Sequence, residues 1–280
     1  MVPVELIPAS SRLLIVAAHP DDETLGAAGL MCLLQRRRDT TIAIAHLTDG
    51  APQNMQDAAS AGFPTAGAYA RARRRELSAA LELLPDGSPE LHVLGFRDQE
   101  AAHALVDVVA VVRGAIDAIR PTVVITHPYE GGHPDHDAAA FAVYAALSGP
   151  AAPSPAPRLL EMTSYHWTGE RLQLGEFVPA AEEQTTLHLS SDVLDIKQRM
   201  LRCFESQRRM IDALRLPDHE RFRPAPHYDF RRPPAAPGRI FYDSFDWGLD
   251  SVTWCQHAEA ALNALHIAPA AMSPAAQPWL

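Results

Sequence analysis

The stretch LLIVAAHPDDETLGAAG, residues 13–29, joins an unbroken apolar run to a histidine and three consecutive acids. The run at 12–18 is typical of a strand buried on both faces of a parallel sheet. Consecutive acids repel one another and are costly to bury without partners. A divalent cation would offset that repulsion. The stretch therefore predicts either a solvated turn or a metal site at the end of a buried strand.

Strand and helix patterns alternate through the first half of the chain. We expect strands at 12–18, 40–48, 91–96 and 121–127, and helices at 25–38, 68–84, 102–119 and 134–147. This alternation predicts an α/β fold, with a Rossmann-like, mostly parallel sheet and helices on both faces. Because ligands bind beyond the carboxyl ends of such strands, we expect residues 19–23 and 127–136 to meet at the C-terminal rim of the sheet.

A Pro/Ala-rich connector at 148–158 separates this half from a less regular one. We expect a single domain over 1–280, made of an α/β core at 1–148, a C-terminal part at 158–266 packed on that core, and a loose tail at 267–280. In the second half we expect strands at 158–166 and 184–190 and helices at 192–207 and 251–266.

Composition narrows the functional classes. The 280-residue chain has a formal net charge of −10, which argues against a nucleic-acid partner or an anionic membrane surface. Its three cysteines lie far apart without CxxC spacing, so we expect no disulfide framework and a cytoplasmic location. No basic leader is evident, and no segment approaches the roughly 20 apolar residues of a membrane anchor. The oligomeric state stays open, a homo-oligomer included.

A second cluster of histidines and acids, HPYEGGHPDHD at 127–137, follows the fourth expected strand. His19 and Asp22 share one tight turn, and His133 and His136 lie three residues apart where a helix begins. Catalytic zinc is typically held by three His or carboxylate ligands with a fourth position open to water. The two clusters together predict such a site.

At these residues the sequence resembles a known family. AAHPDDETLGAAG (17–29) and THPYEGGHPDHDAAAF (126–141) resemble the LmbE-like, or GlcNAc-phosphatidylinositol de-N-acetylase (PIG-L), family of metal-dependent N-deacetylases. LTDGA (47–51), RRRELSAAL (73–81) and LGFRD (94–98) resemble its weaker motifs. The resemblance covers about the first 150 residues in order and is looser beyond them.

The resemblance implies a metal held by three residues, His19, Asp22 and His136. It also implies that Asp21 is the general base, that His133 assists the reacting carbonyl or the leaving amine, and that Asp135 orients the His133 ring. Two histidines and one aspartate suit Fe²⁺, Mn²⁺ or Co²⁺ as well, and the resemblance favours Zn²⁺.

Substrate contacts follow less directly. Some family members carry a mobile tyrosine where this chain has Gly131, so either Tyr129 or Glu130 replaces it or its function is absent here. The substrate-binding candidates are Arg73, Asp49, Tyr129, Glu130 and His127. The loop at 51–67 is expected to edge the pocket through Gln53, Asn54 and Asp57, and the segment at 221–247 to wall the pocket or form a subunit contact.

The function implied is a hydrolase that removes an N-acetyl or other N-acyl group from a small amino-sugar conjugate. A metal-bound water would attack the amide, with Asp21 as general base. Alternatives are an amidase for another N-acylated natural product, a sugar- or nucleotide-binding module, and a structural metal protein. LGAAG (25–29) is not GxGxxG and no GxxxxGK[ST] occurs, while structural zinc sites usually fill four positions. The aglycone, the native metal and the role of Glu23 stay open.

Overall fold

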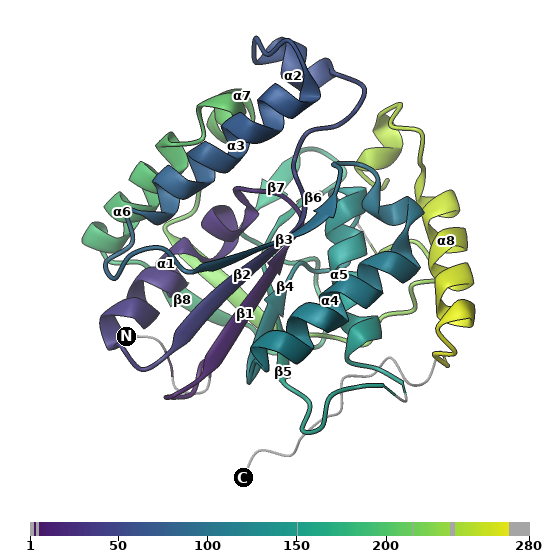
Figure 1. Cartoon of the computed structure of the whole chain (residues 1–280), viewed down its shortest axis with the longest axis horizontal. Helices are drawn as coiled ribbons and strands as arrows, with labels where there is room; N and C mark the ends of the chain where they lie inside the picture. Colours follow the sequence, from purple (N-terminus) through teal and green to yellow (C-terminus); the bar gives the residue numbers. More distant parts are fainter. Residues whose placement is uncertain (1–2, 4–5, 150, 215, 236–238, 269–280) are drawn as a thin grey trace.

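The computed structural model describes residues 3, 6–149, 151–214, 216–235 and 239–268, with a central sheet between two layers of helices (Figure 1). The sheet has seven strands in the order β3-β2-β1-β4-β5-β9-β8. Their bounds are β1 Arg12–Ala17, β2 Thr41–Thr48, β3 Glu90–Phe96, β4 Val123–Thr126, β5 Arg158–Met162, β8 Thr185–His188 and β9 His219–Pro224. β1 to β5 are parallel, whereas β9 runs antiparallel to both β5 and β8. The expected α/β class is confirmed.

β1 occupies the centre of the parallel part of the sheet. It pairs with β2 from Arg12↔Thr41 to Ala17↔His46 and with β4 from Leu13↔Val123. With strands on both sides and helices on both faces, residues 13–17 are buried, which explains the unbroken apolar run. The chain order reverses at β1, because β2 lies on one side and β4 on the other. Such a switch point is where open α/β sheets bind ligands.

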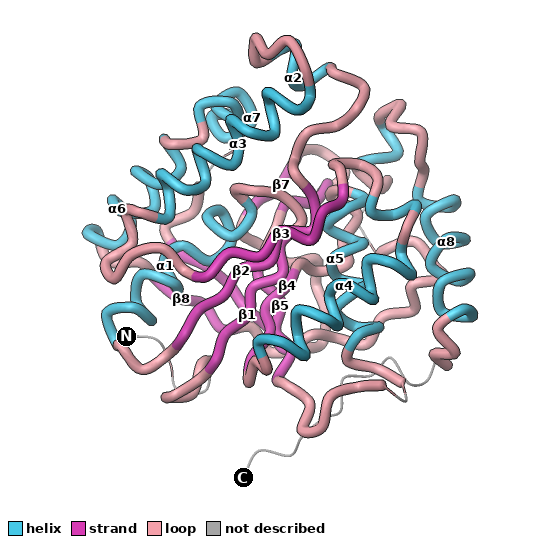
Figure 2. The backbone as a smooth tube through the Cα atoms, in the orientation of Figure 1, coloured by secondary structure: helices cyan, strands magenta, loops and turns pink. Residues whose placement is uncertain are grey.

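Each face of the sheet carries its own layer of helices (Figures 1 and 2). One layer is α4 (Leu105–Ile119), α5 (Pro134–Ala146) and α8 (Ser251–Ala264), and the other is α1 (Asp22–Arg37), α3 (Ala66–Leu81) and α6 (Ser191–Arg202). Two separate apolar cores result, one on each face. The remaining elements are α2 (Gln56–Ser60), α7 (Arg208–Ala213), β6 (Tyr165–Trp167), β7 (Leu172–Leu174) and the 3₁₀ turns η1 (Ala101–His103), η2 (Glu205–Gln207) and η3 (Tyr242–Ser244).

Several expected boundaries were wrong. The first helix begins three residues earlier, at Asp22, because the Thr24 and Leu25 N–H groups bond back to the Asp21 carbonyl. The expected strand at 158–166 divides into β5 and β6, and β6 pairs with β7 outside the central sheet.

Other differences also fall mostly in the second half. The helix expected at 192–207 ends at Arg202 and is followed by η2, while the one expected at 102–119 begins with η1. Of the tail expected at 267–280, residues 269–280 lie outside the described chain. Among the described helices, none has the length and apolar character needed to cross a membrane.

Candidate active site

The two histidine- and acid-rich motifs leave adjacent strands at the same edge of the sheet. After β1 the chain turns through Asp21, whose φ of 135° is a backbone conformation that L residues rarely adopt, and enters α1. After β4 it reaches His133, which caps α5 ahead of Pro134. Because β1 and β4 are parallel neighbours, their carboxyl ends bring both motifs together, as the sequence predicts.

His19, Asp22 and His136 form a buried cluster with metal-ligand spacing. One ligand atom from each lies within 4.8 Å of the others. His19 Nδ1 is 3.2 Å from Asp22 Oδ2, and His136 Nε2 is 3.2 Å from Asp22 Oδ1. The latter contact lacks hydrogen-bond geometry, so His136 Nε2 is a buried nitrogen without a hydrogen-bond partner in the described chain. A shared metal ion would satisfy it.

Polar groups behind the cluster hold the two rings by their other nitrogens. Ser164 Oγ lies 3.0 Å from His136 Nδ1. His19 Nε2 lies 3.2 Å from Asp98 Oδ1 and 3.4 Å from Asp135 Oδ2. Metal-binding histidines usually donate their second N–H to a carboxylate, a carbonyl or a polar group of this kind, which fixes the ring and its tautomer. The arrangement leaves His19 Nδ1 and His136 Nε2 facing Asp22.

Two of the three residues have protonation states that suit a cation, whereas the Asp98, Asp135 and Asp22 carboxylates outweigh burial and raise the pKa of His19 well above its ordinary value. Burial alone would raise the pKa of Asp22, but the His136 and His127 rings outweigh it and hold that pKa well below its ordinary value. Burial lowers the pKa of His136 to about 4. Metals bind carboxylates and neutral imidazoles, so both residues already have the required form at neutral pH.

A second group of ligand-type side chains overlaps the first. His19, Asp98, His133 and Asp135 also offer atoms within 4.8 Å of one another. Asp98 is missing from the sequence-based candidates, although it ends the LGFRD motif just after β3. Its position after a third parallel strand at the same rim was the available signal.

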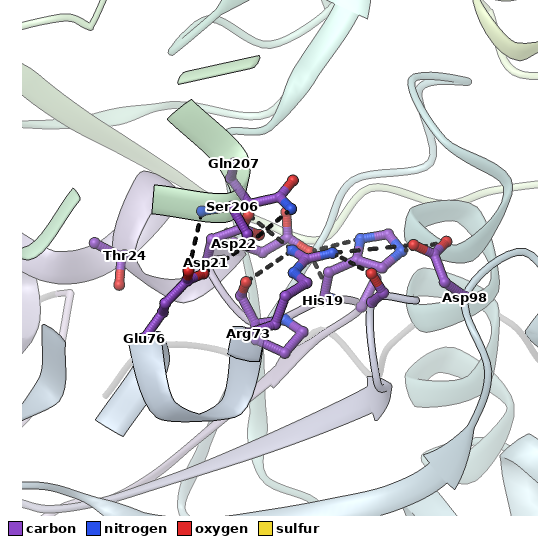
Figure 3. Close-up of polar contacts among 12 residues, drawn as sticks. His19, Asp21, Asp22, Thr24, Arg73, Glu76, Asp98, Ser206 and Gln207 are labelled. Carbon is purple, nitrogen blue, oxygen red and sulfur yellow. Dashed lines mark hydrogen bonds and ion pairs between the residues drawn. The ribbon is translucent and has the colours of Figure 1, made fainter. Parts of the chain in front are cut away.

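Asp21 lies beside the candidate ligands and accepts a hydrogen bond from Arg73 of α3. Arg73 Nη2 donates to Asp21 Oδ2 at 2.8 Å and to the Pro20 carbonyl at 2.9 Å, and Nη1 donates to the Gly50 carbonyl. Figure 3 shows the guanidinium among Asp21, His19 and Asp98. Burial raises the pKa of Asp21 to about 7, Arg73 opposes the rise and the Asp22 charge adds to it.

The expected contact between Asp135 and His133 takes a different form. The Asp135 N–H donates to His133 Nδ1 at 3.1 Å, so the backbone holds the ring. The Asp135 carboxylate instead accepts from the Gln99 N–H at 2.6 Å and faces His19. Asp135 thus contacts the His133 ring through its backbone N–H and not through its carboxylate. The carboxylate supports His19 because the first turn of α5 aims it toward β3.

Arg73, Asp21, Asp22, His19 and His133 all line one cavity of about 1020 Å³. Four of the five substrate-binding candidates do not lie on its lining in the described structure. Asp49 accepts hydrogen bonds from the Ala51 and Asp98 N–H groups. Tyr129 is buried and donates to the Arg232 carbonyl.

Glu130 and His127 are likewise engaged behind the cavity. Glu130 Oε1 accepts from Arg223 Nη2 at 3.0 Å. His127 Nε2 accepts from the Ala18 N–H, and its ring stacks on that of His136 at 4.0 Å. At Gly131 φ is +69° and a Cβ would come within 2.8 Å of Ile240 Cδ1, so a side chain there would strain the backbone and displace Ile240.

The edges of the cavity come from two segments that the sequence left open. From the loop at 51–67, Asp57 and Phe63 line it, while Gln53 and Asn54 bond to the side chains of Glu100 and Gln99. From the segment at 221–247, three aromatic side chains line it: Phe241, Phe245 and Trp247. Tyr165, also on the lining, carried no usable signal because it lies in a three-residue strand.

The structure thus defines an α/β protein with a buried His/Asp cluster at the switch point of a parallel sheet, beside a large cavity, and this cluster is a candidate metal site. Residues 14–147 match the PIG-L family, described as GlcNAc-PI de-N-acetylase. The chain belongs to this family.

Individual relatives agree with that assignment. A probable N-acetyl-alpha-D-glucosaminyl L-malate deacetylase 2 of Bacillus subtilis is 35% identical over 142 residues, 49% of this chain and 60% of the relative. A 1D-myo-inositol 2-acetamido-2-deoxy-alpha-D-glucopyranoside deacetylase of Rhodococcus erythropolis is 32% identical over 202 residues, 62% of this chain and 67% of the relative. The match thus spans about 60% of the length of the Bacillus relative.

Solved structures share the fold. A deacetylase from the teicoplanin biosynthesis pathway superposes with a TM-score of 0.62 at 18% identity, covering 76% of this chain and 97% of that one. A deacetylase acting on the A40926 pseudoaglycone gives a TM-score of 0.61 at 18% identity, with 77% and 97% coverage. At this identity the similarity establishes the architecture alone.

Proposed function

We propose that this chain is a metal-dependent deacetylase that hydrolyses the N-acetyl group of a small amino-sugar conjugate. His19, Asp22 and His136 hold the metal in this proposal, with Zn²⁺ as the expected ion. The observation that carries it is the orphaned His136 Nε2 beside Asp22 and His19, two residues that line a cavity together with Asp21. Membership of the PIG-L family supports the reaction class.

A divalent metal at this site would supply Lewis acidity and lower the pKa of water to about 7. Asp21 receives the proton of the attacking water. Its Oδ2 is bound by Arg73, which leaves Oδ1 for that proton. A pKa of about 7 is well matched to a base that works near neutral pH. Asp21 then returns the proton to the amide nitrogen as the C–N bond breaks, which releases the amine and acetate.

His133 stabilises the carbonyl oxygen in this scheme. Its Nδ1 accepts the Asp135 N–H, so the neutral ring carries its proton on Nε2. Burial holds the pKa of His133 well below its ordinary value, which favours this neutral form. The Nε2–H group can donate to the oxygen on which negative charge develops.

The substrate class rests on the relatives. The Bacillus and Rhodococcus proteins are named for N-acetylated glucosamine conjugates of malate and of inositol. We extend the amino-sugar portion to this chain and treat 1–280 as one domain, because β5, β9 and β8 continue the central sheet. The three cysteines are free thiols, which supports a reducing, cytoplasmic compartment.

The proposal is tested by acetate release from N-acetylglucosaminyl malate and from the inositol conjugate, using the zinc-loaded chain. Asp21→Asn should keep the metal and lose activity by about 10²–10⁴-fold, because it removes the base without removing a ligand. Asp107→Asn, at an exposed position on α4, is the matched control and should behave as wild type. Full activity of Asp21→Asn would contradict the base, and no release from either conjugate by the zinc-loaded wild type would contradict the proposal itself.

A further inference from the structure

Four aromatic side chains that lie next to one another line the cavity. We call the four side chains Tyr165, Phe241, Phe245 and Trp247 the aromatic wall; all four line the cavity. Every one lies outside residues 14–147, the part of the chain that matches the family. The His/Asp cluster and the aromatic wall thus come from different halves of the sequence.

The rings of the wall form a continuous path that starts and ends at the site histidines. The Trp247 ring is 5.0 Å from that of His133, and Phe245 stacks on Trp247 at 4.6 Å with an interplanar angle of 10°. Phe241 lies 5.0 Å from Phe245. The Tyr165 ring lies 6.2 Å from Phe241 and 5.1 Å from the His136 ring, which closes the path. Any group bound next to the site histidines therefore meets aromatic surface at once.

The wall is held in place by the second motif. A Cβ at Gly132 would lie 1.9 Å from the Tyr165 carbonyl oxygen, so strand β6 packs directly on the Gly132 backbone. The Phe241 N–H donates to the Gly131 carbonyl at 3.0 Å. These contacts fix two of the four rings to the same loop that carries His133 and His136.

Apolar surface at the wall is left open. Phe245 is 41% exposed, and Met210, on the other side of the same cavity, is 38% exposed. Both belong to the few large apolar side chains exposed in the described structure. Exposed apolar surface concentrated in a cavity marks a binding site more often than isolated exposed residues do.

Some polar side chains on the lining already bond to one another. Glu76 accepts from both the N–H and the hydroxyl of Ser206, at 3.0 and 2.6 Å, and Gln207 bonds to Tyr69. These side chains satisfy one another across α3 and η2. Two exposed arginines, Arg208 and Arg209, also line the cavity and make an anionic group the competing occupant.

We infer that the substrate carries an apolar group next to its N-acylated amino sugar, and that this group packs against the aromatic wall. The inference rests on the proposed function. The apolar group belongs either to the aglycone or to the N-acyl chain, since both leave the amino sugar close to His133. An apolar group of this kind would distinguish the substrate of this chain from those of the named Bacillus and Rhodococcus relatives, whose malate and inositol portions are polar.

Four probes test it with the zinc-loaded full chain. They are methyl N-acetylglucosaminide, its p-nitrophenyl analogue with an aromatic aglycone, its carboxymethyl analogue with an anionic one, and the methyl glycoside of N-octanoylglucosamine. Binding is measured by calorimetry and hydrolysis by release of the carboxylic acid. Stacking on one aromatic ring is worth up to about tenfold in affinity, so the p-nitrophenyl or the octanoyl probe should bind up to about tenfold more tightly than the methyl N-acetyl probe. Which one does so identifies the source of the apolar group.

Phe245→Ala should reduce this preference to about threefold or less, because it removes the most exposed ring of the wall. Val252→Ala, at a 58% exposed apolar position on α8, is the control and should keep the preference. Equal handling of the apolar and methyl probes, a preference that survives Phe245→Ala, or strongest binding of the carboxymethyl probe would each overturn the inference.

The two readouts separate this inference from the proposed function. Tighter binding of an apolar probe that depends on Phe245, with no acid released from any probe, would keep the aromatic wall and contradict the deacetylase. Acetate release from all N-acetyl probes at equal kcat/KM, with equal affinities, would support the deacetylase and contradict the role of the aromatic wall.

Discussion

Glu23 is the residue that holds the turn on which the site depends. It is buried, and its Oε2 accepts the Asp21 N–H at 3.2 Å and lies 2.9 Å from His46 Nε2. Its Oε1 accepts the Thr24 hydroxyl at 2.5 Å. Asp21 has a φ of 135°, and such a conformation costs of order 1–3 kcal/mol and persists only where its surroundings fix it. Glu23 is therefore a positioning residue for Asp21.

Glu23→Gln should weaken the acceptor for the Asp21 N–H and lower the free energy of unfolding by about 1–3 kcal/mol. We expect kcat to fall while the metal content stays at the wild-type level, because no ligand is removed. Denaturant unfolding and metal analysis check this. Glu259→Gln, exposed on α8, is the control. Unchanged stability and unchanged kcat would show that Glu23 does not position Asp21.

Individual site residues could be predicted from the sequence only where they belong to one local motif. His19 and Asp22 are separated by one turn, and His133 and His136 by one helical step, so their proximity follows from the chain itself. Asp98 could not be predicted in this way, because it reaches the site through the relative placement of β3 and β1, with β2 between them. Asp49 and Glu130 lie in the right motifs, but backbone N–H groups and Arg223 respectively use their carboxylates.

At the level of elements, a buried ion pair ties α1 to α6 and β9. Lys197 Nζ donates to the Leu25 carbonyl and to Glu220 Oε1, both at 2.7 Å. The Glu220 carboxylate accepts from the N–H groups of Gly29 and Leu30 at 2.7 and 2.8 Å. Polar groups of α1 thus bond outside their own helix, and the helix that begins at Asp22 is fixed against the second half of the chain.

Lys197→Met should lower the free energy of unfolding by about 3–5 kcal/mol, since it leaves the Glu220 charge buried without its partner. The double variant Lys197→Met/Glu220→Gln should recover part of that loss. Arg36→Met breaks the exposed pair with Asp192 and should cost less than about 1 kcal/mol. Urea unfolding measures all three. A Lys197→Met effect as small as that of Arg36→Met would contradict the role of the buried pair.

Elements were predictable where the pattern is long and regular. The buried strands of the parallel core and their helices follow from continuous apolar runs and helical periodicity. β6 and β7 have three residues each, too few for a period to show. β9 lies in an Arg- and Pro-rich segment, and its burial comes from pairing with β5 and β8.

In the whole molecule, the two halves of the chain contribute different parts of the candidate site. The α/β half supplies the His/Asp cluster, Asp21 and Arg73 at the switch point of the sheet. The second half completes the sheet and adds Ser164 behind His136 and the aromatic wall above it. Fold class and candidate ligands could be predicted because they rest on local motifs. The shape of the cavity could not, because it depends on how distant segments pack.

The central claim is that His19, Asp22 and His136 bind one divalent metal ion. Anomalous diffraction at the zinc absorption edge, from crystals of the zinc-loaded chain, tests it most directly. We predict one strong peak within coordination distance, about 2.0–2.2 Å, of His19 Nδ1, an Asp22 oxygen and His136 Nε2. A peak among His19, Asp98, His133 and Asp135 instead, or no peak at either group, would contradict the account.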